Sequence, residues 1–310
     1  MTSRLRAAAA VLCLAAGTAA AAETPNRVLR TEFGIGAESQ TSPLVQISPQ
    51  GTLIRLEGVD RLRGEHLRAG AEGFYDVPLG DGMSASIAAS ANGKRAPGQP
   101  DFDFASASVQ PAVHASLSGV AVGLGLNRGR IDVARRHFRD TGGVQADATL
   151  ADGDDHWSLV VERSRWRHRG DLVDLDTRAT TVLLQRHVAI DSTWLTAADV
   201  GAVGVREGNL RGFPELSSRG ALLQATLEGR WGEAGWSAGL AWHRARFDDT
   251  PFVGEPARVD RAWMADLSIQ WPLTPSHAVR LDYSGVFNRS TSAIFTNRYR
   301  QFALVLQSDW

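Results

Sequence analysis

The last ten residues, QFALVLQSDW, alternate between apolar and polar positions. The apolar set is Phe302, Leu304, Leu306 and Trp310, and the polar set includes Gln301, Gln307 and Asp309, with Asn297 continuing it just upstream. A period of two gives a β-strand one apolar face and one polar face. The pattern therefore predicts a final strand that buries only one of its faces.

The same alternation recurs upstream in the chain. It is clear over residues 275–290, 259–272, 223–231 and 144–150. A helix would scatter these apolar residues around its cylinder, whereas a strand collects them on one side. The chain is therefore predicted to be all-β.

The connecting segments alternate in length. The short ones are LGDGM (79–83), QPAV (110–113), ADGDD (151–155), AIDST (189–193), GEAG (232–235) and PLTPS (272–276), and the long ones span about 39–65, 92–101, 128–140, 168–177, 206–218, 247–258 and 288–296. Tight turns at one rim and longer loops at the other are typical of transmembrane β-barrels, whose short turns are periplasmic. The pattern predicts an antiparallel up-and-down barrel of about fourteen strands, with both termini on the short-turn side. Whether residues 39–65 contain an extra hairpin is left open.

Tryptophan placement gives an independent indication of this topology. Six of the nine tryptophans fall next to short turns or at the chain end: Trp157, Trp194, Trp231, Trp236, Trp271 and Trp310. Aromatic rings gather in this way at a membrane interface, so these six are predicted to form a girdle. A soluble β-sandwich is the alternative, but its strands are commonly about five or six residues long, and it gives no reason for a one-sided belt.

The first residues are typical of a secretory signal peptide. Arg4 and Arg6 precede the apolar run AAAAVLCLAAG, and small residues follow up to Ala22. We expect residues 1–22 to be removed and residues 23–310 to form an outer-membrane β-barrel. Loss of Arg4 and Arg6 takes the formal net charge from −1 to −3, which is not that of a nucleic-acid-binding polycation.

The inward face of the predicted barrel carries both signs of charge. The lumen-lining candidates are Glu162, Gln185, His187, Asp199, Glu228, Arg230, Asp266, Arg280 and Asp282. Two interpretations stay open. These side chains pair with one another inside a barrel of moderate width, or they conduct or guide a solute.

Two arginine clusters lie near long connectors, RRHFR (135–139) and RSRWRHR (163–169). Guanidinium groups at that level suit the phosphates of lipopolysaccharide, which they bind as bidentate pairs. The candidates are Arg135, Arg136, Arg139, Arg165, Arg167 and Arg169. The alternative is that they are solvated loop charges.

The histidines are scattered along the chain without a catalytic motif. The sequence contains no GxSxG, HExxH or CxxC pattern that would support a nucleophile or a metal ion. We therefore expect no enzyme activity, no catalytic residues, no cofactor and no metal site.

Residues 246–310 resemble the C-terminal barrel of the surface lipoprotein assembly modifier family. The matching parts are Arg258 with Asp260 at the start of a strand, Tyr283 followed by Asn288 and Ser290 at the next long loop, and NRYR entering the final strand. The resemblance implies a barrel that helps lipoproteins reach the outer leaflet. Family members usually carry periplasmic tetratricopeptide repeats ahead of the barrel, whereas this chain enters the strand-like VLRTEFGIGAE (28–38) and shows no period of roughly 34 residues.

The resemblance thus implies an outer-membrane barrel that assists translocation or surface display of a lipoprotein or another exported substrate. The alternative is a passive diffusion pore for small solutes. The expected partners are the outer membrane with its lipopolysaccharide, the barrel assembly machinery during insertion, and a lipoprotein substrate or a separate periplasmic repeat protein. No nucleic-acid partner is expected.

Overall fold

The computed structural model describes residues 26–47, 53–98, 103–250 and 254–310. These described residues form fourteen strands: β1 (Asn26–Ile47), β2 (Leu53–Gly80), β3 (Met83–Arg95), β4 (Phe104–Leu117), β5 (Val120–Val133), β6 (Arg136–Asp152), β7 (Asp155–His168), β8 (Thr177–Ala189), β9 (Leu195–Asn209), β10 (Ser218–Trp231), β11 (Ala234–Phe247), β12 (Val259–Thr274), β13 (His277–Ser290) and β14 (Asn297–Asp309). Short 3-10 turns lie in the connectors, namely η2 (Gly170–Leu175), η3 (Pro214–Leu216) and η4 (Ala293–Phe295). Within the described ranges, no helix is long and apolar enough to cross a membrane. The predicted signal peptide lies outside them.

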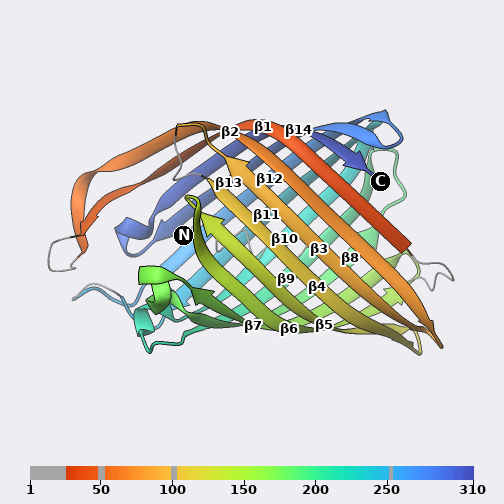
Figure 1. Cartoon of the computed structure of the whole chain (residues 1–310), viewed down its shortest axis with the longest axis horizontal. Helices are drawn as coiled ribbons and strands as arrows, with labels where there is room; N and C mark the ends of the chain where they lie inside the picture. The colour runs from red at the N-terminus through yellow and green to blue at the C-terminus, as the bar shows by residue number, and fades with distance from the viewer. Residues whose placement is uncertain (1–25, 48–52, 99–102, 251–253) are drawn as a thin grey trace.

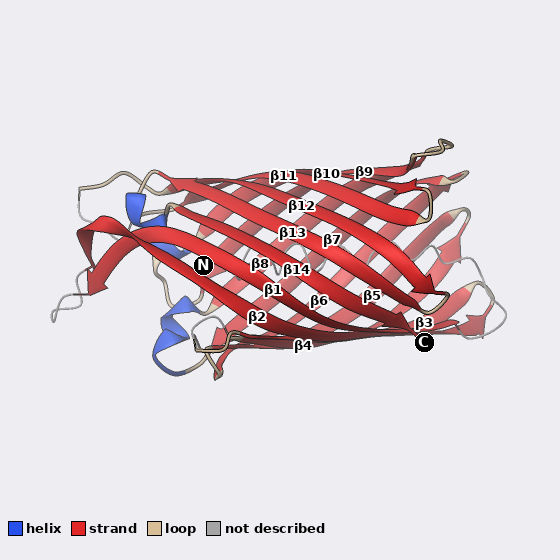
Figure 2. Cartoon of the chain, turned by 90° about the horizontal axis from the view of Figure 1, so that it is seen from above, coloured by secondary structure: helices blue, strands red, loops and turns tan. Residues whose placement is uncertain are grey.

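The strands form one closed antiparallel barrel (Figure 1, Figure 2). Each strand pairs with its neighbours in the chain, and β1 pairs with β14 in a register that runs from Arg30 opposite Asp309 to Thr41 opposite Arg298. Closure leaves no unpaired strand edge along this wall. The predicted fold class and strand number are confirmed.

The two faces of β14 show how the wall is oriented. Phe302, Leu304 and Leu306 are exposed on the outside, whereas Gln301 and Gln307 are buried on the inside. This is the reverse of a soluble protein, and it suits a barrel with lipid around it and a polar lumen.

The turn end of the barrel carries the tight connectors. The chain reverses at 81–82, 118–119, 153–154, 232–233 and 275–276, and over 190–194 between β8 and β9. The predicted turn QPAV (110–113) was wrong, because these residues lie within β4. Proline lacks a backbone N–H, and the pairing of β4 with β5 is interrupted at Pro111, between Val109 and Ala112. The pairing of β4 with β3 is continuous there, with Pro111 opposite Ile87.

The loop end carries the longer connectors, with one correction. Residues 128–140 were predicted to be a long loop, but they are strand except for Ala134 and Arg135, whose φ angles are 51° and 62°. Two successive positive φ angles make a two-residue hairpin turn of the primed type. Glycine or asparagine usually occupies such a turn, so this sequence gave no signal for it.

Most of residues 39–65 is strand as well. The pairing of β1 with β2 continues to Ile47 opposite Leu53, well past Thr41, where the pairing of β1 with β14 stops. These two strands therefore project beyond the wall as a two-stranded ribbon of residues 42–47 and 53–66, here called the β1–β2 ribbon (Figure 1).

Candidate functional site

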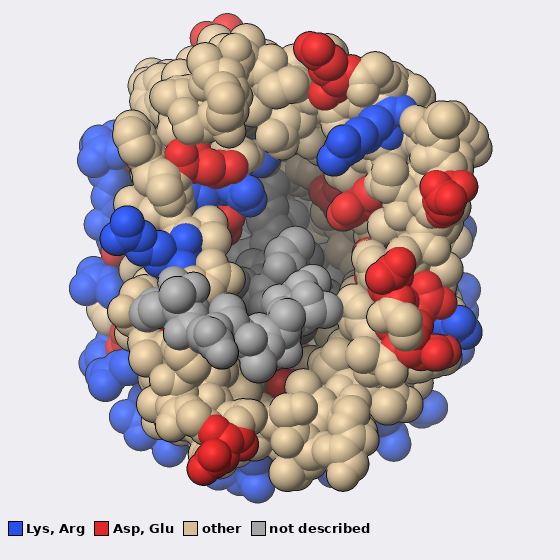
Figure 3. Space-filling model, turned by 90° about the vertical axis from the view of Figure 1, so that its right-hand side faces the viewer, with Lys and Arg blue, Asp and Glu red and all other residues tan. Residues whose placement is uncertain are grey.

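The candidate site is the lumen of the barrel. Asp266 lies in the middle of β12, between Gly239 and Ser284 of the neighbouring strands, and Asn92 lies on β3. Asp266 alternates with outward-facing residues such as Leu267, and Asn92 alternates with outward-facing residues of β3, so both side chains face inward. Both are nevertheless exposed. Water thus reaches the inner wall at mid-height. Figure 3 shows the opening at the turn end, with charged side chains around its rim.

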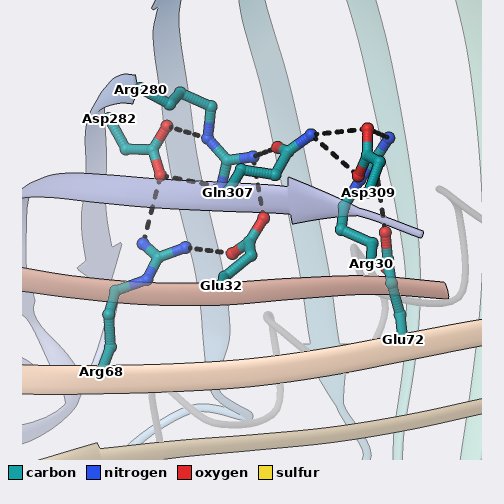
Figure 4. Close-up of polar contacts among 8 residues, drawn as sticks. All are labelled: Arg30, Glu32, Arg68, Glu72, Arg280, Asp282, Gln307 and Asp309. Atoms are coloured by element: carbon teal, nitrogen blue, oxygen red, sulfur yellow. Dashed lines mark hydrogen bonds and ion pairs between the residues drawn. The ribbon is translucent and has the colours of Figure 1, made fainter. Parts of the chain in front are cut away.

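A group of eight polar side chains, here called the seam network, crosses the closure of the barrel (Figure 4). Its members are Arg30, Glu32, Arg68, Glu72, Arg280, Asp282, Gln307 and Asp309, from β1, β2, β13 and β14. Arg68 lies 3.0 Å from Glu32 and 3.2 Å from Asp282, and Arg280 lies 2.8 Å from each of the same two carboxylates. These four residues form a closed ring of alternating charge.

The rest of the seam network extends this ring toward the chain termini. Gln307 accepts a hydrogen bond from Arg280 and donates to Asp309, while Arg30 pairs with Asp309 at 2.8 Å and with Glu72 at 3.2 Å. The first two and the last two strands are therefore tied together on the lumen side. Because the charged members of the network remain partly exposed to lumen water, each ion pair contributes less than a dry ion pair would.

A second polar group spans β7, β8 and β9. Asp199 accepts a hydrogen bond from the amide of Gln185 at 2.8 Å and lies 3.2 Å from Nδ1 of His187. The ring of His156 stacks on that of His187, with centroids 4.7 Å apart. The carboxylate therefore holds both of its partners against the wall.

The loop-end cluster consists of Glu38, His66, Lys94, Tyr299 and Gln301, and it is much less accessible. Lys94 Nζ lies 2.7 and 2.8 Å from the two oxygens of Glu38, and the hydroxyl of Tyr299 donates to the same carboxylate at 2.8 Å. Gln301 Nε2 lies 3.0 Å from Nε2 of His66. The Glu38 side chain is 0% exposed, and Tyr299 is 4% exposed. Side chains therefore fill the space along this part of the wall.

Other inward side chains near the loop end are also buried. The Arg139 guanidinium lies 4.5 Å above the ring of Trp166, and that of Arg258 lies 3.3 and 3.9 Å from the rings of Phe247 and Phe295. Stacking on aromatic faces stabilises a desolvated guanidinium. These stacked guanidinium groups add to the buried inward side chains near the loop end.

The predicted lumen residues occupy several places rather than one site. Arg280 and Asp282 belong to the seam network, and His187 and Asp199 to the group on β7–β9. Glu162 accepts a hydrogen bond from Asn127, and Glu228, Arg230 and Asp266 are exposed. The sequence analysis missed the partners on β1 and β2, because alternation shows which face a residue occupies but not which distant strand lies beside it.

The six predicted girdle tryptophans lie at the turn end. Trp236 stacks between Trp194 and Trp231, at centroid distances of 6.3 and 5.6 Å, and Trp157, Trp271 and Trp310 are exposed. A second aromatic row lies nearer the loop end, where Trp242 is directly opposite Trp263, and Trp263 is directly opposite Phe287. The interfacial role of these rings stays a prediction.

The six predicted lipopolysaccharide arginines divide by their position. Arg136, Arg165 and Arg167 are exposed, Arg135 pairs with Asp103 at 2.6 Å, and Arg169 pairs with Asp140 at 2.6 Å. Arg139 is only 1% exposed and faces the lumen, so it does not reach an external lipid. Arg139 was predicted to lie in a loop, but it belongs to β6 and shares the inward face of Gln145.

Asp103 is a buried carboxylate in the connector between β3 and β4. Its burial alone would raise its pKa, but a hydrogen bond from the backbone N–H of Ala96 and the nearby Arg135 guanidinium hold the pKa below the ordinary value. Asp103 therefore links Ala96 to Arg135 of the β5–β6 turn.

The described residues include no group of three or more His, Cys, Asp or Glu side chains that could hold a metal ion. The titratable side chains that meet in the described lumen are engaged with one another, and no reaction is assigned to them. The expectation that the chain is not an enzyme stays a prediction.

A closed antiparallel barrel with an apolar exterior and charged and polar side chains in its interior is the architecture of outer-membrane β-barrel proteins. A Pseudomonas aeruginosa FadL homologue matches the chain with a TM-score of 0.50, over 91% of this chain and 90% of that chain, at 10% identity. OmpTdeltaL8, a loop-deletion mutant of Vibrio cholerae OmpT, gives a TM-score of 0.48 over 93% and 99%, at 9% identity. The translocator domain of the autotransporter NalP from Neisseria meningitidis gives 0.40 over 99% and 96%, at 11% identity.

At these identities the likeness establishes the fold alone. No protein-family model and no curated protein matches the chain. The surface lipoprotein assembly modifier family therefore stays a resemblance, carried by residues 246–310.

Proposed function

We propose that the chain is a transport channel of the outer membrane, with a lumen that is open at the turn end and narrows toward the loop end. The observation that carries this proposal is the contrast between exposed polar side chains at mid-height on β3 and β12 and almost fully buried ones near the loop end. Asp266 is exposed at mid-height although it faces inward, whereas Glu38, Arg139 and Tyr299 near the loop end are almost fully buried. A wall of this kind forms a wide vestibule that leads to a constriction.

The spacing of the two aromatic rows supports the membrane location. Trp263 and Trp271 are eight residues apart on β12, which is about 27 Å along an extended strand. A tilt of roughly 40° reduces this to about 21 Å along the barrel axis, close to the height of about 25 Å expected for the apolar band. Heat-modifiable migration in unboiled gels is the expected sign of such a barrel, and recovery as a soluble periplasmic protein would contradict it.

The charge of the constriction bears on which solutes would pass. Glu38 is neutralised by Lys94, and the inner wall of the turn half carries acids and arginines in alternation. Opposite charges side by side give a weak mean field, so the channel should discriminate by size more than by the sign of the ion.

Single-channel recording in planar bilayers tests the proposal. The refolded barrel should show small, uniform openings, and Tyr299→Ala should raise the conductance because it removes a ring from the constriction. The matched control is Tyr283→Ala, since that ring lies on the outward face against Phe302, at a centroid distance of 4.8 Å, and its loss should leave the conductance unchanged. If neither the wild type nor Tyr299→Ala shows channel openings, the channel proposal is refuted.

A role in export or surface display is the second candidate. It rests on the family resemblance and on the β1–β2 ribbon, whose outer backbone edges have no strand partner beyond Thr41 and before Leu67. Free edges accept an added strand, so the ribbon offers a place for an extended segment of an exported lipoprotein. On this candidate the barrel is electrically silent, and deleting the ribbon abolishes surface exposure of a co-expressed lipoprotein while the barrel still inserts. A separate repeat protein would then supply periplasmic recruitment.

A further inference from the structure

The outward face near the loop end carries a compact patch of arginines. Arg206, Arg219 and Arg246 lie directly opposite one another on β9, β10 and β11. Arg244, Arg261 and Arg289 form a second such row on β11, β12 and β13. All six are exposed, and β11 contributes one arginine to each row. We call these six residues the arginine patch.

The patch differs in composition from the charged groups of the lumen. The 33 basic residues of the chain include a single lysine, Lys94, and that lysine faces inward. Among the described ion pairs, none joins an acid to any of the six arginines, whereas those of the seam network are paired repeatedly. Figure 3 shows Lys and Arg side chains around the outer circumference, with many Asp and Glu side chains nearer the rim of the opening. The arginines of the inner wall are thus balanced by neighbouring acids, whereas no described ion pair balances those of the patch.

Such an arrangement is unfavourable by itself. Like charges directly opposite on antiparallel strands have Cβ atoms about 5 Å apart and destabilise the pair. Each row repeats this juxtaposition twice, at Arg206–Arg219–Arg246 and at Arg244–Arg261–Arg289. A polyanion lying across the strands would turn the repulsion into attraction.

The level of the patch indicates which anion it meets. Trp242, Trp263 and Phe287 lie two residues below Arg244, Arg261 and Arg289 on the same outward faces. Two residues correspond to about 7 Å along a strand, so the guanidinium groups stand just beyond the aromatic row, at the depth of lipid headgroups. Arg206 and Arg219 line a cavity of about 430 Å³ together with Ser218 and two acids, Glu207 and Asp248.

We infer that the arginine patch binds the phosphate groups of an acylated, phosphorylated glycolipid in the surrounding leaflet. Arginine forks bind phosphate oxygens in pairs, and rows of forks suit a headgroup with more than one phosphate. The patch contains none of the arginines proposed from the sequence alone. The inference rests on the proposed membrane location of the barrel.

Native mass spectrometry of the refolded barrel in detergent, with diphosphorylated lipid A as the probe, tests this inference. Arg219→Gln/Arg261→Gln removes the centre of both rows and should weaken binding about ten-fold or more, the size of one lost charge-assisted hydrogen bond. The matched control, Arg27→Gln/Arg186→Gln, removes two exposed arginines at the turn end and should keep the wild-type affinity. Equal binding by the patch variant and the wild type would overturn the inference.

Two further probes identify the chemistry that is recognised. Lipid A without its phosphates should bind weakly, and equal binding would show that the acyl chains alone are recognised. If millimolar sodium phosphate stabilised the barrel as much as lipid A does, the ligand would be free phosphate and the lipid assignment would fall.

Folding failure and channel failure are separated by two more measurements. If the glutamine variant does not refold, Arg219→Lys/Arg261→Lys keeps the charge and removes the fork; weaker binding supports the inference, and unchanged binding refutes it. Conductance is recorded on the same samples, so a silent barrel that still binds lipid A would refute the channel and leave the patch assignment standing.

Discussion

Replacing Lys94 by methionine should strongly destabilise the barrel. Lys94 is the cation of a pair whose carboxylate, on Glu38, is 0% exposed, and its Nζ lies within 2.8 Å of both carboxylate oxygens. Methionine has nearly the same length and no charge, so the change leaves a buried carboxylate with only the hydrogen bond from Tyr299 among its contacts described above. Removing one partner of a buried ion pair costs about 3–5 kcal/mol.

The exposure of the two partners predicts an asymmetry between them. The Lys94 side chain is 13% exposed, so its ammonium group can turn toward lumen water once the carboxylate is gone. Glu38→Gln should therefore cost less than Lys94→Met, about 1–2 kcal/mol. The double variant buries two neutral groups and should recover at least about 2 kcal/mol relative to the sum of the single changes, because replacing a whole pair is far less costly than breaking it.

Urea unfolding of the refolded barrel, followed by tryptophan fluorescence, provides the four free energies of the double-mutant cycle. The midpoints are compared at equal slopes, so that a change in the amount of surface exposed on unfolding is recognised. A loss below about 1 kcal/mol for Lys94→Met, or strictly additive single changes, would mean that lumen water reaches Glu38 and that the loop end is not constricted.

Other expectations concern the chain end and the loops. Trp310→Ala should reduce the amount of barrel inserted in cells and change the melting of the purified barrel only modestly, because the ring is 70% exposed while the Trp310 backbone N–H bonds to Leu29 whatever the side chain. One interfacial ring contributes on the order of 1.5–3 kcal/mol at most, so normal insertion with much earlier melting would contradict this prediction. The contacts of Asp103 with Ala96 and Arg135 should weaken in acid. The pKa of Asp103 in the folded protein lies below the ordinary value of 3.8, so the stabilisation by the carboxylate is present above pH 3.8 and is lost as the pH falls below the folded pKa. Hydrogen exchange of the Ala96 amide, slow at pH 5 relative to its intrinsic rate, should lose protection as the pH falls below 3.8. Protection that is independent of pH would refute the role given to Asp103.

Much of the wall could be predicted from local pattern. Alternation at Phe302, Leu304 and Leu306 identifies the lipid-facing side of β14, because the period of a strand is fixed by its backbone. Alternation does not predict that Pro111 lies inside a strand or that Ala134 and Arg135 form a tight turn. Both features depend on a backbone geometry that these residue types rarely adopt. Wherever geometry departed from the usual residue preferences, the sequence analysis misplaced the connector.

The candidate site could be predicted only in part. Arg280 and Asp282 were predicted to line the lumen, but their partners Glu32 and Arg68 lie more than 200 residues away in the sequence. Nothing local in a strand states which strand it will meet when the sheet closes. Arg139 was placed among loop arginines because residues 128–140 were predicted to be a loop; once β6 extends to Arg136, alternation puts Arg139 on the same inward face as Gln145.

The β1–β2 ribbon also determines where this chain can lengthen. In the described part of the ribbon, the strand pairing is between β1 and β2 alone, so residues added at its tip leave the tilt and stagger of the fourteen-stranded wall as they are. An insertion of one residue in each strand keeps every side chain below it on its original face, whereas a residue added to a single strand would require a bulge. Paired insertions should thus be tolerated without retuning the barrel, which makes this hairpin the natural position for a grafted epitope tag.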